Sequence, residues 1–101
     1  MRIGVAKIVL DFYNNDSVKL KRSQLEGLCK DLRKKFNISA MEIADFDDVE
    51  RCVIGFAAVI PDTWENKSAE TFIQKICEEI DRTAFARVTS EDWDILVHGE
   101  A

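Results

Sequence analysis

Hydrophobic residues follow two different spacings along the first part of the chain. Residues 3–12 are rich in Ile, Val and Leu with only isolated charges, which predicts a strand. The polar residues 13–16 follow and favour a turn. Asp16 or Ser17 is suited to cap a helix, and Asn37 to end it. Between these limits, apolar residues recur at the intervals of one helix face, namely Leu25, Leu28, Cys29, Leu32 and Phe36.

The middle of the chain reads as two further strands. Residues 38–44 predict a second strand and residues 45–50 a short acidic connection. Residues 51–60 predict a third strand that is apolar on both faces near its middle, which favours a central place in a sheet. Pro61 ends this strand, because proline cannot donate to a sheet ladder.

A second helix and a last strand complete the pattern. Asp62 and Glu65 have the spacing of a capping box, which predicts a helix with Asp62 at its N-cap. Apolar residues again share one helix face, namely Ala69, Phe72, Ile73, Ile76, Cys77 and Ile80. Residues 84–97 predict a fourth strand, with a bend or bulge near residues 90–92.

The order βαββαβ predicts the fold class. Two helices cannot cover both faces of a four-stranded sheet, so we expect them on one face of an α+β two-layer sandwich. Right-handed crossovers then give the split-βαβ, ferredoxin-like topology with an antiparallel sheet. Residues 1–101 show no linker or repeat and form one predicted domain. This fold serves many functions and selects none of them.

Composition limits the class of protein. The chain has 101 residues, of which 47% are hydrophobic and 33% charged, as in an ordinary globular domain. The three cysteines form no C-x-x-C pair, which favours buried, reduced thiols over a disulfide or zinc site. We see no signal peptide, lipidation motif or apolar run long enough to span a membrane, so we expect a cytoplasmic protein.

Charge is concentrated in the first predicted helix. Residues 19–35 contain seven basic and two acidic residues, a net charge of +5, whereas the rest of the chain carries −10. At about 100° per residue, five basic residues fall opposite the apolar face, namely Lys19, Arg22, Lys30, Arg33 and Lys34. Lys21 falls toward the apolar side, where it either packs its stem and snorkels or precedes the regular helix.

This basic helix allows two interpretations. One is contact with the phosphates of RNA or with another acidic surface. The other is a solvated helix face without a partner. An RNA-recognition motif would stack bases on aromatic residues of its third strand. Here Gly55, Phe56 and Ala57 fit that pattern, but Ile54 and Ala58 replace its basic and second aromatic residues, so we expect Phe56 to be a packing residue.

We find no motif for catalysis, a cofactor or a small-molecule substrate. The chain has one His and no phosphate-binding loop or dinucleotide fingerprint, so we expect a non-enzymatic protein without a cofactor. The acidic residues between the second and third strands offer oxygen ligands for a hard cation, but match no calcium-loop spacing, namely Asp45, Asp47, Asp48 and Glu50. We therefore interpret them as a solvated turn and expect no metal.

Three segments resemble a known family. Residues 17–22 (SVKLKR) resemble the S-L-K-x-K-R signature of the YlxP-like bacterial proteins, the domain of unknown function 503 (DUF503). Residues 36–39 (FNIS) and Glu42 are similar to the family's F-N-V-S…E run, and Asp47, Arg51 and Gly55 to its D…R-A-x-x-G stretch. The chain departs from the pattern at Val18, in the loop 13–16, and before Arg51, where the family's aromatic residue is missing.

The resemblance implies a ferredoxin-like fold and no established activity. Family members are often encoded beside genes for translation initiation, transcription elongation and ribosome maturation, which implies a place near RNA or the ribosome. Matched to the signature, Ser17, Lys19, Lys21 and Arg22 would form an anion site at the helix N-terminus. A structural account fits equally, with Ser17 as a cap and Lys21 covering apolar surface.

We therefore expect contact with RNA or a ribonucleoprotein through the basic first helix. The alternative is a protein-interaction or homodimerising module that uses the sheet face without helices. Six residues are candidates for one sheet face or the other, which the sequence does not separate, namely Val5, Val9, Val53, Phe56, Trp93 and Ile95.

Overall fold

Six elements follow one another in the expected order. A computed structural model describes residues 1–83 and 85–99. The elements are β1 (Arg2–Asp11), α1 (Val18–Phe36), β2 (Ser39–Ala44), β3 (Arg51–Ile60), α2 (Asn66–Asp81) and β4 (Arg87–Val97). Five of them begin and end within about three residues of the predicted limits, and β3 matches them fully. Residue 84, where the last strand was expected to begin, lies outside the described residues.

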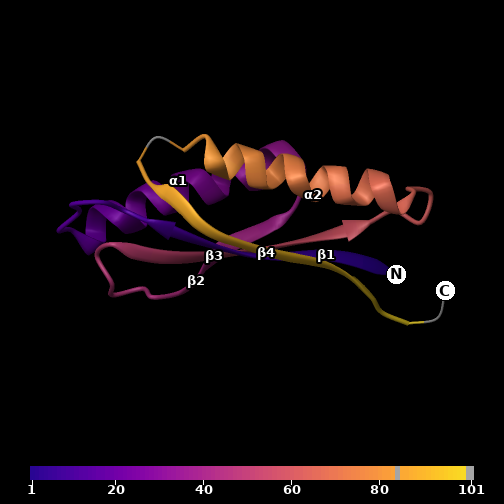
Figure 1. Cartoon of the computed structure of the whole chain (residues 1–101), viewed down its shortest axis with the longest axis horizontal. Helices are drawn as coiled ribbons and strands as arrows, with labels where there is room; N and C mark the ends of the chain where they lie inside the picture. Colours follow the sequence, from indigo (N-terminus) through magenta and orange to yellow (C-terminus); the bar gives the residue numbers. More distant parts are fainter. Residues whose placement is uncertain (84, 100–101) are drawn as a thin grey trace.

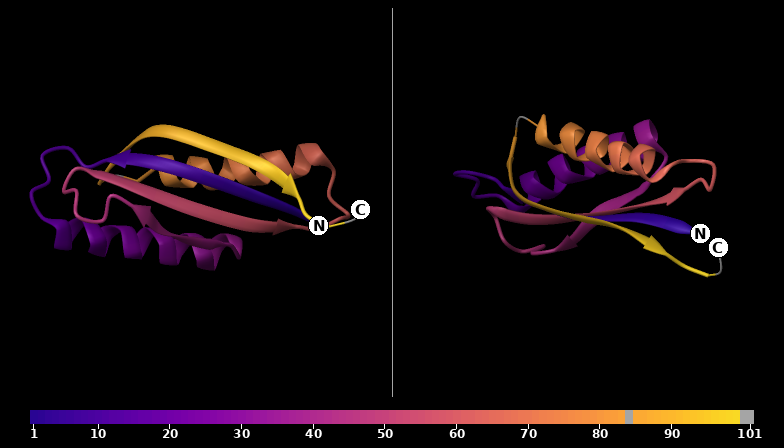
Figure 2. Two further views of the ribbon diagram at one scale, coloured as in Figure 1. Left: turned by 90° about the horizontal axis from the view of Figure 1, so that it is seen from below. Right: turned by 45° about the vertical axis from the view of Figure 1, so that its right-hand side comes forward.

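The four strands form one antiparallel sheet in the order β2-β3-β1-β4. Both helices lie on the same face, and the opposite face carries none of the described elements (Figure 1). Helix α1 packs on the β2 side of the sheet and α2 on the β4 side (Figure 2). This arrangement confirms the predicted α+β ferredoxin-like sandwich, because each helix returns the chain across one face of the sheet.

The core lies between the sheet and the helices. Even-numbered residues of β1 and β3 point toward the helices, and Ile8 and Ile54, which pair at the centre, are fully buried. The structure assigns each of the six residues that the sequence could not place to one of the two sheet faces. Phe56, Trp93 and Ile95 share a face with the core, so the prediction that Phe56 packs inside is confirmed. Val5, Val9 and Val53 lie on the open face.

The start of α2 differs from the prediction. The helix begins at Asn66, and Glu65 occupies the N-cap position without a side-chain hydrogen bond, so the capping box headed by Asp62 is wrong. Residues 61–64 form a turn instead, closed by the Trp64 N–H on the Pro61 carbonyl at 3.0 Å. Arg2 holds this turn from β1 by donating to the Pro61 carbonyl and to the Asn66 side chain. Hydrogen bonds from Arg2, which is far away in the sequence, thus stabilise a turn where the local sequence pattern predicts a capped helix start.

The bulge expected in the last strand is present one residue earlier. The register between β1 and β4 shifts where Val9 pairs with Ser90 and Leu10 with Val88, which leaves Thr89 as the extra residue. The Thr89 hydroxyl donates to the Val9 carbonyl at 3.3 Å. The bulge therefore bends β4 near its start, next to residues 45–50, which join β2 to β3.

Candidate nucleic-acid interface

Helix α1 begins and ends at the residues that the sequence predicts. The Ser17 hydroxyl accepts from the Leu20 N–H at 3.1 Å, which confirms Ser17 as the N-cap. Asn37 ends the helix in the left-handed conformation, with φ 53°, and its N–H donates to the Arg33 carbonyl. Three basic residues in the last turn face the negative end of the helix dipole, namely Arg33, Lys34 and Lys35.

Five exposed basic side chains lie on one side of α1 in two groups, one toward each end of the helix, and together we call them the α1 basic surface. It consists of Lys19, Arg22, Lys30, Arg33 and Lys34. At about 100° per residue these positions span an arc of about 120°. The arc starts at the edge of β2, where Arg22 and Arg33 lie beside Glu42, and continues to the outer side of the helix. Along the axis it covers about 22 Å, at 1.5 Å per residue.

The charges of this surface are left free by the rest of the protein. Within residues 1–83 and 85–99, no side chain of the five forms an ion pair. Arg33 donates one guanidinium N–H to the Ala40 carbonyl at 2.8 Å, which orients it along the β2 edge. Glu26 is the one acidic residue of the arc. By contrast Lys35, on the opposite flank of α1, pairs with Glu79.

Lys21 does not belong to this surface, which corrects its assignment as an RNA contact. Its side chain is fully buried, and its ammonium group donates to the carbonyl oxygens of Asp45 at 2.8 Å and Arg51 at 3.0 Å. A third hydrogen bond reaches the Asp48 carbonyl, and the Glu42 carboxylate lies 3.5 Å away. We call these groups the Lys21 network. All three N–H bonds of the ammonium are used inside the protein, so none remains for phosphate.

Helix geometry explains the burial of Lys21. The residue lies four positions before Leu25 and therefore projects within the apolar arc that faces the sheet. Its stem crosses this apolar surface, as predicted, but its ammonium turns toward the β2–β3 loop (residues 45–50) and does not reach solvent. The anion site inferred around Ser17 therefore loses one of its cations. The structural account of Ser17 and Lys21 is the one that their contacts support.

Side chains of the β2–β3 loop add a second layer to the Lys21 network. The Asp48 carboxylate accepts from the backbone N–H groups of Glu50 at 2.9 Å and Arg51 at 3.0 Å. These two hydrogen bonds are the main reason why the pKa of Asp48 is lowered, since they favour its ionised form. Arg51 pairs with the Asp45 carboxylate at 2.6 Å. Asp48 and Asp45 thus stabilise the conformation of the loop from within, through backbone hydrogen bonds and an ion pair.

The loop does not gather its carboxylates into a cation site. Throughout the part of the chain that the structure describes, no group of three or more His, Cys, Asp or Glu side chains is placed to hold a metal ion. Two of the four acidic residues that suggested such a site have partners within the protein: Asp45 pairs with Arg51, and Asp48 accepts from backbone N–H groups. Asp47 and Glu50 are exposed.

A groove of about 300 Å³ lies between α1 and the edge of β2. We call it the α1–β2 groove. Its floor consists of Leu25 and Cys29, and Phe46 of the β2–β3 loop lines it while remaining 47% exposed. Arg22 and Arg33 line it from α1. Phe46 was not among the residues predicted from the sequence, where its one signal is that of an isolated aromatic residue within an acidic loop.

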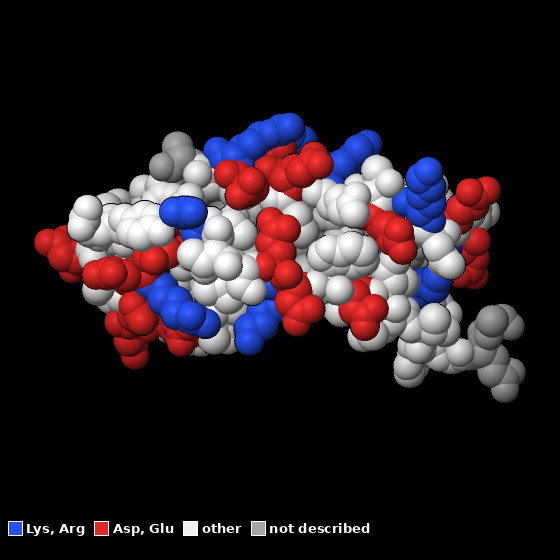
Figure 3. All heavy atoms as spheres, viewed as in Figure 1, with Lys and Arg blue, Asp and Glu red and all other residues white. Residues whose placement is uncertain are grey.

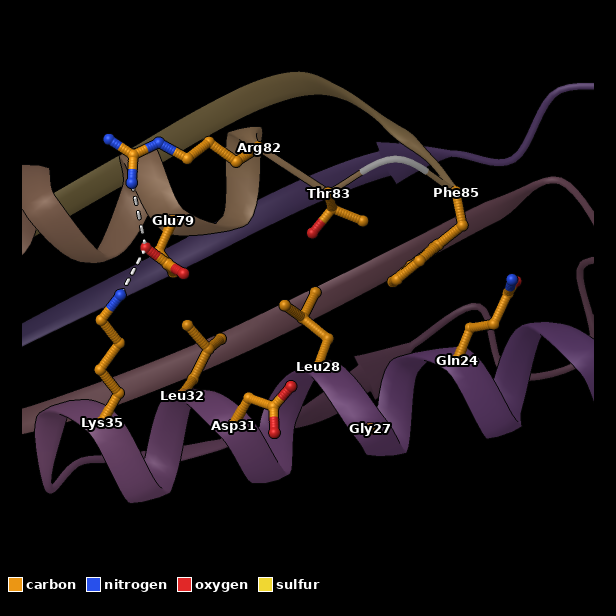
Figure 4. Close-up of a pocket in the computed structure, with 10 residues that line it drawn as sticks. All are labelled: Gln24, Gly27, Leu28, Asp31, Leu32, Lys35, Glu79, Arg82, Thr83 and Phe85. Atoms are coloured by element: carbon orange, nitrogen blue, oxygen red, sulfur yellow. Dashed lines mark hydrogen bonds and ion pairs between the residues drawn. The ribbon is translucent and has the colours of Figure 1, made fainter.

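A second cavity of about 410 Å³ separates the two helices. Figure 4 shows Leu28, Leu32 and Phe85 projecting into it from α1 and from the segment that precedes β4. One end is bridged by Glu79, which accepts from Lys35 at 3.0 Å and from Arg82 at 3.4 Å. Two cations share this one carboxylate, so the cavity has an apolar wall and an ion-pair bridge that joins the two helices.

The three cysteines are buried, as the sequence predicts. Burial raises the pKa of Cys52 to about 12 and that of Cys77 to about 11, and it raises the pKa of Cys29 as well. The thiols therefore remain protonated at neutral pH. Protonated, enclosed thiols are poor nucleophiles and poor metal ligands.

Comparison with known proteins identifies the family. A family model described as a protein of unknown function (DUF503) matches residues 3–93, which is most of the chain. The chain belongs to the DUF503 family. No curated protein matches it. Neither helix in the described ranges combines the length and apolar character needed to cross a membrane.

The DUF503 segments recognised in the sequence meet in one place. Lys21 of the first segment, Glu42 of the second and Arg51 of the third all belong to the Lys21 network or contact it. Gly55 of the third segment lies under Ile43, whose Cγ2 would be 3.0 Å from a Cβ at that position. In this chain Asp48, next to the matched Asp47, supplies the carboxylate that holds the loop. The segments thus define a structural junction between α1 and the β2–β3 hairpin.

We expect Lys21→Met to destabilise the protein by about 3 kcal/mol or more, because it leaves three part-buried carbonyl groups and the largely buried Glu42 carboxylate without their partner. Urea unfolding followed by circular dichroism measures this effect. Lys19→Met is the matched control: Lys19 is exposed, and its loss should change stability by about 0.5 kcal/mol or less. Equal effects of the two substitutions would show that the Lys21 network does not hold the loop.

Asp48 should make stability depend on acid pH. Its pKa is lowered by folding, so its charge contributes stability above the unfolded pKa of about 3.9, and this contribution is lost as pH falls through the folded value. We expect Asp48→Asn to destabilise the protein at pH 7 and to have a smaller effect at pH 3. Urea titrations at both pH values compare it with Asp47→Asn, an exposed neighbour. A difference between wild type and Asp48→Asn that is independent of pH would contradict this account.

Proposed function

We propose that this DUF503 protein binds RNA, free or within a ribonucleoprotein, through the α1 basic surface. The observation that carries the proposal is the set of five exposed cations, free of ion pairs within the described residues. Two guanidinium and three ammonium groups along about 22 Å provide donors for a run of phosphates. Neutralised phosphates release bound counterions, which drives this kind of association.

The rest of the molecule would orient such a complex. The chain has a net charge of −5, so most of its surface repels a polyanion while α1 attracts it. On the face where β4 lies in front, acidic side chains are interspersed with basic ones, and the atoms drawn there form no continuous basic patch (Figure 3). The β4 strand itself carries Glu91, Asp92 and Asp94. RNA would therefore meet the protein with α1 toward it and β4 away.

Charge reversal on α1 tests the proposal against a matched control. We expect Lys30→Glu with Lys34→Glu to weaken binding to RNA by about tenfold or more at low salt, because phosphate contacts dominate such affinities. The control pair is Lys67→Glu with Lys75→Glu, two exposed lysines of α2. Both variants change the net charge by the same amount, so the comparison isolates position from total charge. Fluorescence anisotropy with a labelled ribosomal RNA fragment gives the affinities.

The salt dependence and a pull-down complete this test. The slope of log affinity against log salt should fall by about 0.7 for each single-strand phosphate contact that is lost. Tagged wild-type protein should retain RNA from a lysate of its source cell, and nuclease should release it. Equal affinities of the α1 and α2 variants, or a captured partner indifferent to nuclease and salt, would refute RNA binding by α1.

The open sheet face supports a second candidate function, self-association. Large apolar side chains are exposed there, including Val59 at 68% and Leu96 at 46%. Ile3, which pairs with both, joins them into one apolar area. A second copy of the chain would remove this area from water.

A dimer built on this face has a direct test. Light scattering over a concentration series should then show a mass that rises toward twice 11.5 kDa. Val59→Asp should keep the protein monomeric, because it would bury a carboxylate in the contact. A wild type that stays monomeric at every concentration would exclude this candidate.

A further inference from the structure

The α1–β2 groove combines features that the α1 basic surface alone lacks. Its floor is apolar, with Leu25 and Cys29 almost fully buried. Phe46 offers an aromatic ring that is about half exposed. Arg22 and Arg33 stand three helical turns apart on the same side and belong to both the groove and the basic surface. A ligand lying along α1 would therefore pass directly over this groove.

Hydrogen bonds to its neighbours hold the turn that carries Phe46. The residue lies between Asp45 and Asp48, whose carbonyl groups both accept hydrogen bonds from Lys21. The Asp48 N–H donates to the Asp45 carbonyl at 3.1 Å, which closes the turn around Phe46. Because the buried ammonium fixes both sides of this turn, the ring is presented at little conformational cost.

We infer that the α1–β2 groove accommodates one unstacked nucleotide of single-stranded RNA. This inference rests on the function proposed above and names the part of the RNA that the protein selects. The base would lie against the Phe46 ring, since bases stack on aromatic side chains whatever their identity. Arg22 and Arg33, three helical turns apart, would contact backbone phosphates upstream and downstream of it. A volume of about 300 Å³ stands at the lower end for small-ligand sites, which suits one planar group.

The two acidic residues of the groove are compatible with this ligand. Glu42 lies 3.5 Å from the Lys21 ammonium, which compensates its charge. Glu26 lies on α1 between the two arginines, and its carboxylate repels phosphate, so phosphates would bind at the arginines on either side of it. A duplex would keep its bases stacked and unable to enter the groove, while its phosphates could still contact the α1 basic surface. The site should therefore distinguish single strands from duplexes.

The experiment compares two RNA probes and two protein surfaces. The probes are a labelled unstructured 12-nucleotide RNA and a blunt RNA duplex of 12 base pairs. We expect Phe46→Ala to weaken binding of the single strand about fivefold or more, the effect of losing one stacked base, and to leave duplex binding unchanged. Lys30→Glu with Lys34→Glu should weaken binding of both probes, because it removes phosphate contacts.

Two controls make the result specific to the groove, and one further variant provides a second test of RNA binding. Phe46→Tyr keeps an aromatic ring and should retain single-strand affinity. Leu96→Ala removes a side chain of nearly the same exposure from the open sheet face and should change neither affinity. Arg22→Gln, at an exposed position, should weaken binding of the single strand even if Phe46→Ala folds poorly.

The possible outcomes separate this inference from the proposed function. If Phe46→Ala and Arg22→Gln both bind the single strand as wild type does, while the lysine variant loses affinity, the groove holds no nucleotide and RNA binding by α1 stands. Equal losses on the single strand and the duplex would show a general phosphate contact and overturn the inference. If wild type binds neither probe, the proposed function fails together with it.

Discussion

A single buried ammonium group connects the first helix to the hairpin of β2 and β3. Removing the charge of Lys21 from water is costly, and three backbone carbonyls with the Glu42 carboxylate compensate it. These partners lie 21 to 30 residues further along the chain, so the contact forms only when α1 has docked on the sheet. The conformation of the β2–β3 loop, and hence the position of Phe46, depends on this contact.

Neighbouring basic residues of α1 consequently have opposite roles. Lys21 is enclosed and structural, whereas Arg22, one residue later and about 100° further around the helix, is exposed. The DUF503 signature contains both, so its basic character alone does not measure the charge available to a partner. Lys21 is a fixed internal cation, and the residues of the α1 basic surface are external ones. The α1–β2 groove lies between the loop that Lys21 holds and the two arginines of that surface.

The sequence allowed the fold to be predicted because its periodicity is strong and local. The apolar face of α1, the central place of β3 and the Ser17 cap all follow from residues near one another. The start of α2 did not follow, since Arg2 of β1 stabilises a turn where a capping box was expected. The groove could not be predicted at all, because it depends on Lys21 reaching the loop from another element. The sequence predicted six basic residues of α1 as contacts for RNA. Five of them are exposed, and the sixth, Lys21, is buried.

The three buried thiols can report local opening of the structure. Each belongs to a different element, with Cys29 on α1, Cys52 on the central strand β3, and Cys77 on α2. A thiol reagent can reach one of them only when that element separates from its neighbours, since the native packing excludes solvent and keeps the thiol protonated. Labelling kinetics at each position would therefore measure how often α1, the sheet and α2 part from one another in solution, with the native cysteines as the only reporters needed.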